Sequence, residues 1–116
     1  MKKVIIGIAP QKKTRERMFA MAKGTYKAKE HEPRIWFTSM KPVAALLSDN
    51  NRAMLRVIRD EQPESISALA VLTGIKLSSL SRTLKTMARY GIVELRQENN
   101  RTRPIFEATD IHIVIY

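Results

Sequence analysis

A basic stretch in the second half of the chain carries side chains that suit nucleic-acid recognition. Read as a helix over Leu77–Tyr90, it turns a set of polar and basic groups outward: Ser78, Ser79, Arg82, Lys85 and Arg89. Arginine pairs bidentately with the edge of a guanine, and serine bonds to bases or phosphates. Lys85 and Arg89 lie further along, where we expect contacts with phosphates rather than bases. The pattern leaves open which serine would face the nucleic acid.

The distribution of charge favours a polyanionic partner. The chain of 116 residues has a formal net charge of +10. Residues 1–36 carry net +7, residues 37–64 are neutral and residues 92–116 carry −1. Residues 65–91 carry +4 with no acidic residue, although protein surfaces usually mix both signs. Such an excess on a small chain indicates nucleic acid before a membrane surface.

Apolar spacing predicts how the basic segment is held. Leu80, Leu84 and Met87 fall on one face of the Leu77–Tyr90 helix, as a core-facing helix requires. Gly91 is expected to end this helix in a left-handed conformation, which a side chain would resist. The basic side chains are then left on the opposite, outward face.

Two helices are predicted to precede the basic one. The first spans about residues 50–61 and is capped by Ser48 or Asp49. The second is capped by Ser67, spans 68–73, and is followed by a tight turn at Gly74. Their predicted core residues are Met54, Leu55, Ile58, Leu69, Ala70 and Leu72.

A β-hairpin is predicted after the basic helix. Ile92–Glu98 and Thr102–Ala108 have strand-like patterns, and Asn99-Asn100 between them is a turn signal. The order of helix, short helix, glycine turn, basic helix and hairpin predicts an α+β fold of the winged helix-turn-helix type, with a three-helix core and a hairpin wing. In such a fold the short helix braces the basic one, whose width suits the major groove of DNA.

A resemblance to winged helix-turn-helix regulators of the MarR/ArsR type is carried by the stretch SISALAVLTGIKLSSLSRTLKTMARYGIVEL, residues 65–95. With VIIGIAPQKKTRERMFAMAKG and RIWFTSM included, the whole chain resembles a group of small prokaryotic MarR-like regulators, some of them antitoxins. The resemblance implies that Leu77–Tyr90 is a recognition helix, which lies in the major groove of double-stranded DNA, and that the hairpin is the wing.

The resemblance also assigns roles outside the helix. Arg101 and Arg103 take the place of wing residues that enter the minor groove or clamp a phosphate, and Arg96 lies at the tip or on the flank of the hairpin. One departure concerns Lys76, since those families usually have Ser, Thr or Asp just before the recognition helix. Lysine cannot cap a helix N-terminus, so either a nearby serine compensates or the helix starts one or two residues later. Lys76 remains a candidate DNA contact.

The remaining segments predict an arm and a terminal strand. The arm, residues 1–36, holds a strand at Val4–Ile8 and a helix at Thr14–Lys23 with Met18 as core filler. A short strand at Arg34–Thr38 and a helix to Leu47 follow. The winged domain is assigned to residues 37–108 and a C-terminal strand to residues 109–116.

The two apolar end strands are Val4–Ile8 and Ile111–Tyr116. If left exposed, they would be sheet edges prone to pair with other chains. We expect them to pair with each other or across a two-fold axis, which would give a homodimer. Two recognition helices would then lie about one DNA turn apart.

Enzyme, metal and membrane functions find no support in the sequence. The chain has no cysteine, and its two histidines, His31 and His112, lie far apart, so neither a disulfide nor a metal site is expected. No phosphate-binding glycine loop, nucleophile motif or acid–base pair is present. We expect no enzymatic activity, no cofactor, no membrane segment and a cytoplasmic location.

Three functions remain open. The first is a sequence-specific transcriptional regulator, most simply a repressor. The second is an antitoxin that regulates its own operon and neutralises an acidic toxin protein. The third is a winged helix used only for protein contact, because fold alone does not determine function. The basic arm could serve as a phosphate contact, a surface for an acidic protein or a solvated helix face.

Overall fold

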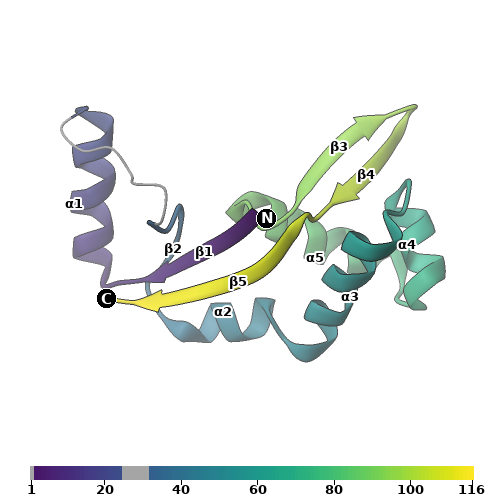
Figure 1. Ribbon diagram of the computed structural model, residues 1–116, viewed down its shortest axis with the longest axis horizontal. Helices are drawn as coiled ribbons and strands as arrows, with labels where there is room; N and C mark the ends of the chain where they lie inside the picture. The colour runs from purple at the N-terminus through teal and green to yellow at the C-terminus, as the bar shows by residue number, and fades with distance from the viewer. Residues whose placement is uncertain (1, 25–31) are drawn as a thin grey trace. The chain divides into compact units, whose positions relative to one another are not determined.

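The structure is a computed structural model, and it describes residues 2–24 and 32–116. This part of the chain forms a mixed α+β fold with five helices and two small sheets (Figure 1). The elements in chain order are β1 (Lys2–Ile8), α1 (Gln11–Ala22), β2 (Ile35–Phe37), α2 (Met40–Leu46), α3 (Asp49–Glu61), α4 (Ile66–Thr73), α5 (Leu77–Tyr90), β3 (Glu94–Glu98), β4 (Arg101–Ile105) and β5 (Ala108–Ile115). No helix in these two ranges is both long and apolar enough to cross a membrane.

The described residues divide into two compact units. The first contains the chain up to Ala45 together with Ala108–Tyr116, and the second contains Leu46–Glu107. This division differs from the ranges predicted at residues 36 and 109. The difference arises because β2 joins the sheet of β1, and because β5 starts at Ala108 and joins the same sheet.

The first unit is built on a parallel sheet of three strands in the order β2-β1-β5. Of the two pairings expected for the end strands, the structure shows the one within a single chain, with Ile6 opposite Ile113. On the other side of β1, Gly7 lies opposite Trp36. A Cβ atom at Gly7 would lie 2.5 Å from Cζ3 of Trp36, so the indole requires glycine there. Trp36 also contacts Tyr116, with ring centroids 5.3 Å apart.

Helix α1 differs from its prediction. It starts at Gln11 rather than Thr14, and the side chains of Met18 and Phe19 are each 63% exposed. The assignment of Met18 to the core was therefore wrong. The physical reason is that the charged residues of α1 lie in its first half and the apolar residues run consecutively in its second half, so that no apolar stripe forms along one face. The ring of Phe19 instead contacts the ammonium group of Lys23, 4.5 Å from the ring centroid.

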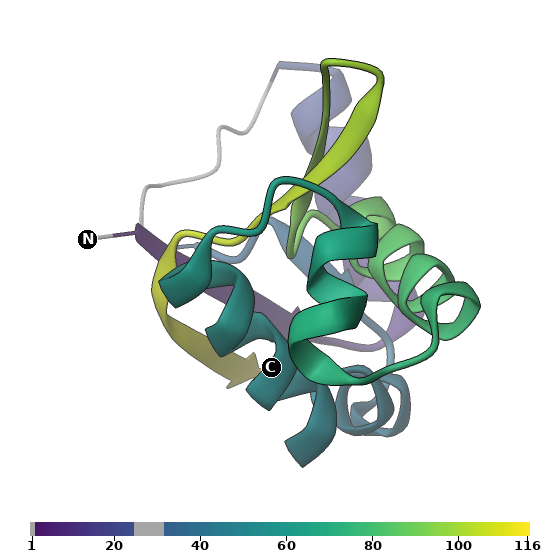
Figure 2. The same cartoon turned by 90° about the vertical axis from the view of Figure 1, so that its right-hand side faces the viewer.

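The second unit packs three helices and a hairpin around one core. Helix α4 packs against α3 and α5, and the hairpin β3–β4 contacts all three helices (Figure 2). The fully buried side chains of α3, α4 and α5 were predicted correctly: Met54, Leu55, Ile58, Leu69, Leu80, Leu84 and Met87. Pro104 of β4 is also fully buried. Asn99 and Asn100 both have positive φ, which gives the predicted tight turn between β3 and β4.

Three local predictions are corrected. Helix α4 is capped by Ser65, whose hydroxyl accepts from the amide of Ala68 at 3.0 Å, whereas Ser67 lies inside the helix. Leu72 is 54% exposed because α4 buries only a narrow stripe centred on Leu69. The hairpin strands are shorter than predicted, because Ile92 precedes β3 as a buried link.

Candidate functional site

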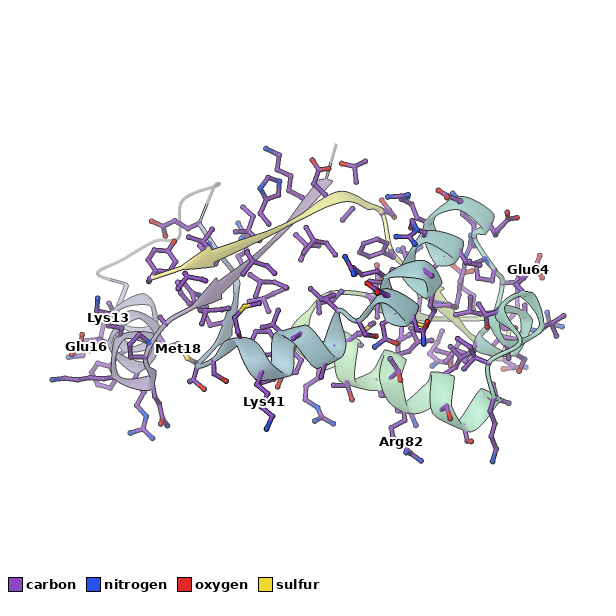
Figure 3. The ribbon with its side chains drawn as sticks, turned by 90° about the horizontal axis from the view of Figure 1, so that it is seen from below. Lys13, Glu16, Met18, Lys41, Glu64 and Arg82 are labelled. Atoms are coloured by element: carbon purple, nitrogen blue, oxygen red, sulfur yellow. The ribbon has the colours of Figure 1, made fainter. Side chains whose placement is uncertain are left out.

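Helix α5 presents two opposed stripes of side chains. It starts at Leu77 and ends at Gly91, whose φ of 84° is the expected left-handed conformation. The buried stripe is Leu80, Leu84 and Met87. The exposed stripe follows the same helical spacing on the opposite side and consists of Ser78, Arg82, Lys85 and Arg89. Figure 3 shows Arg82 projecting outward from α5. Burial of one stripe therefore fixes the direction of the other.

The cations of α5 keep their charge uncompensated. Among the described residues, none of the four basic side chains on or next to α5 forms an ion pair with a carboxylate: Lys76, Arg82, Lys85 and Arg89. Helices α4 and α5 also contain no acidic residue of their own. This face of the second unit is therefore a concentrated positive surface, which attracts an anionic partner.

The structure separates the three serines of α5, Ser78, Ser79 and Ser81, among which the sequence could not decide which would face the nucleic acid. Ser78 is exposed and lies four residues before Arg82, on the basic stripe. Ser79 lines a groove with residues of α3, including Asn50 and Asn51. Ser81 is half-buried and faces the first turn of α4. Ser78 is therefore the serine that shares a face with the cations.

The start of α5 carries no side-chain cap. Lys76 occupies the N-cap position and makes no capping hydrogen bond. The alternative of a later helix start is wrong, because the helix begins at Leu77. Neither Ser78 nor Ser79 compensates through its side chain with a described residue. Helix α4 shows the contrast, since its first turn is capped by Ser65.

The hairpin arginines are paired within the protein. Arg96 contacts Glu94 at 3.2 Å and Glu98 at 3.8 Å, and Arg103 contacts Glu98 at 3.4 Å. Arg96 therefore belongs to the hairpin flank. Arg101, beside the turn, lies 3.5 Å from Glu64 in the segment that precedes α4. Sequence reasoning identified these arginines but not their partners.

An open groove lies between α4, α5 and the tip of the hairpin, with a volume of roughly 640 Å³. Its lining is mostly polar: Ser65, Ile66, Ser67, Leu77, Ser81, Asn100, Arg101 and Thr102. Hydroxyl, amide and guanidinium groups of this kind suit a phosphate backbone. Thr102 and Ser65 were missed as candidate site residues because only folding brings the hairpin tip next to the first turn of α4.

Metal chemistry has no candidate in the part of the chain that the structure covers. No group of three His, Asp or Glu side chains there is placed to hold an ion. His112 and Asp110 lie 3.9 Å apart on β5, but among the described residues no third side chain of this kind completes a site with them. The arrangement at α5 instead offers hydrogen-bond donors and positive charge.

Fold and site together define a small α+β protein that presents a basic helix beside a hairpin. Residues 46–113 match the HVO_A0114 family, over more than half of the chain, and the chain belongs to that family. No curated protein and no solved structure matches the chain.

Proposed function

We propose that the protein binds double-stranded DNA in a sequence-specific way and regulates transcription, acting as a repressor in the cytoplasm. The observation that carries the proposal is the exposed stripe of α5. Ser78, Arg82, Lys85 and Arg89 share one helix face, and no described carboxylate neutralises their charges. The opposite face is anchored in the core, so the basic face is presented rigidly.

In this proposal α3, α4 and α5 with the hairpin β3–β4 act as a winged helix-turn-helix. Helix α5 lies in the major groove, where Arg82 reads a guanine and Ser78 bonds to a base or phosphate. Lys85 and Arg89 clamp the DNA backbone further along. Lys76 contacts a phosphate at the start of the helix, where its charge is otherwise mildly unfavourable.

The hairpin has a supporting part in the same proposal. Arg101 lies beside the tip and faces the groove lined by Ser67 and Thr102. A phosphate in this groove would replace Glu64 as the partner of Arg101. Arg96 and Arg103 contribute to the positive side of the hairpin, although Glu94 and Glu98 offset them.

Selection of bound duplexes from a random pool tests the proposal. We expect the full chain to enrich a near-palindromic sequence, as a dimer with two recognition helices would. Affinity for the selected duplex should fall steeply with salt, with a slope of roughly five to eight released counterions per dimer.

A matched variant distinguishes α5 from the other basic helix. Replacing Lys12, Lys13 and Arg15 of α1 by glutamine removes as much charge as replacing Arg82, Lys85 and Arg89. We expect only the α5 variant to lose the selected motif. Absence of any salt-dependent duplex binding would refute the proposal and leave a winged helix used for protein contact.

A further inference from the structure

Strand β5 has one side bonded and one side open. Within the described ranges it pairs with β1 alone and forms an edge of the sheet. The amide N–H of Tyr116 donates to the carbonyl oxygen of Ile8 at 2.8 Å. Because backbone groups alternate in direction along a strand, Ile111, Ile113 and Ile115 direct theirs toward the open edge. The edge thus offers backbone donors and acceptors at regular spacing.

Between Ile111 and Ile115 this edge lacks the features that protect natural sheet edges, because the register irregularity of the β1–β5 pair lies earlier in the strand, between Ala108 and Asp110. Proline, lysine, a bulge or short length normally prevents pairing with another chain. Strand β5 spans eight residues without proline, lysine or arginine, and its side chains at Ile113 and Ile115 are 41% and 69% exposed. The opposite edge, β2, has only three residues and follows Pro33 and Arg34. The chain therefore protects one edge and leaves the other ready to pair.

We propose that β5 pairs antiparallel with β5 of a second copy of this chain, around a two-fold axis at Ile113. The two sheets of three strands would then form one continuous sheet of six. This assignment does not depend on DNA binding, although it would supply the dimer that binding to a palindromic site requires.

The side-chain pattern of β5 favours a copy of itself over an unrelated strand. In the proposed register Ile113 faces the partner's Ile113, and Ile111 faces the partner's Ile115. All three isoleucines lie on one face of the sheet, so the apolar surface of β5 in one copy would contact the same surface in the other copy. A register shifted to His112 would instead set Ile115 against the partner's Thr109.

The charge distribution also favours pairing between two copies of β5. The whole chain carries +10, which opposes self-association, yet β5 contains no basic residue apart from His112. Its single acid, Asp110, lies 3.9 Å from that histidine, on the face opposite the isoleucines. Two β5 strands therefore approach without bringing lysine or arginine together.

Charged substitutions at the axis test the proposal without DNA. We expect the full chain to be a dimer by light scattering after gel filtration. Ile113→Lys and Ile113→Glu should each raise the dimer dissociation constant by about 100-fold or more, because like charges would face each other across the axis. An equimolar mixture of the two variants should recover the dimer, since opposite charges then meet. Val71→Lys, at an 84% exposed position on α4, is the control and should remain dimeric.

Two proline substitutions distinguish loss of the dimer from loss of the fold. Ile113→Pro removes an amide N–H that faces the open edge and no hydrogen bond to β1, and edge strands tolerate such a change. It should keep the circular dichroism of the folded chain and abolish the dimer, whereas Val114→Pro breaks the ladder to β1 and should destabilise the fold. A monomeric wild-type chain, or a dimer that persists in the Lys, Glu and Pro variants at Ile113, would overturn the proposal. Either result would leave DNA binding by α5 to be judged separately.

Discussion

Helix α5 and the hairpin β3–β4 carry similar numbers of cations but use them differently. The cations of α5 pair with no described carboxylate, whereas Arg96, Arg101 and Arg103 each contact a glutamate. A phosphate that approaches α5 meets charge that is already available. A phosphate that approaches the hairpin must first displace a carboxylate, so less net binding energy is released. The number of arginines on a surface is therefore a poor measure of its affinity for DNA.

The register of the hairpin explains why its arginines are paired. Arg96 on β3 lies directly opposite Arg103 on β4. Like charges at facing positions destabilise a strand pair. Glu94 and Glu98 lie two residues to either side of Arg96, on the same face of β3, and contact these arginines. The hairpin acids thus stabilise the hairpin itself. On α5 the cations Arg82, Lys85 and Arg89 are also neighbours, spaced three and four residues apart, but no described carboxylate offsets their mutual repulsion.

The largest expected effect compares charge removal in the two regions. Replacing Arg82, Lys85 and Arg89 by alanine should weaken binding to the selected duplex by about 100-fold or more. These positions are exposed and alanine favours helix, so the fold should persist. The hairpin variant replaces Arg96, Arg103, Glu94 and Glu98 by glutamine, which removes two arginines together with the glutamates that they contact and leaves the net charge unchanged. It should alter affinity by only about threefold. Fluorescence anisotropy titrations measure the affinity of both variants for the selected duplex. A larger loss of affinity in the hairpin variant would contradict our comparison.

Two single substitutions separate base reading from backbone contact within α5. Arg82→Ala should cost about 1–3 kcal/mol on the selected duplex and relax the preference at one base position. Lys85→Ala should weaken all duplexes alike and lower the salt slope by about one counterion. Titrations against the selected and a scrambled duplex at several salt concentrations measure both effects. Equal losses on the two duplexes for Arg82→Ala would assign Arg82 to the phosphates.

Lys76 links stability to binding at the start of α5. Serine is a good N-cap residue and lysine is not, so Lys76→Ser should stabilise the protein by about 0.5–1 kcal/mol. The same change removes a cation that faces DNA in our proposal, so affinity for all duplexes should fall a few-fold. Urea unfolding with an unchanged m-value measures the first effect. Ser65→Ala is the opposite control, and it should cost about 1 kcal/mol at the capped start of α4. A stabilised variant with undiminished DNA affinity would show that Lys76 has no part in binding.

The elements that sequence alone predicted correctly are those with local determinants. Helix α5 has an apolar stripe, Leu80 to Met87, and a glycine stop at Gly91, and both of its ends agree with the structure. The Asn99-Asn100 turn is likewise fixed by residues that tolerate positive φ. The sequence could not predict which arginine pairs with which glutamate, because the pair of Arg101 with Glu64 joins segments far apart in the chain.

Burial of individual side chains could not be predicted from their apolar character alone, because it depends on how the helices pack. Met18 and Leu72 were assigned to cores because apolar residues are usually buried, yet α1 and α4 leave them exposed. The parallel pairing of β5 with β1 could not be read from either strand, because both are β-branched runs without a marker of direction. The candidate site was more predictable than the sheet because a single helix carries most of it.

The smallest expected effect tests whether the Glu64 contact restrains Arg101. Glu64→Gln should release Arg101 for a phosphate and tighten DNA binding by about 0.2–1 kcal/mol, less than about fivefold. Removal of any nearby acid also raises the positive field, so the control is Glu61→Gln, which makes the same charge change on α3 three residues away. Only the Glu64 variant loses a contact with the hairpin, and its gain should disappear when Arg101→Ala is added, whereas the Glu61 gain should not. Equal gains in the two glutamine variants, with or without Arg101, would mean that the hairpin tip contributes only to the general field and that α5 alone binds the DNA.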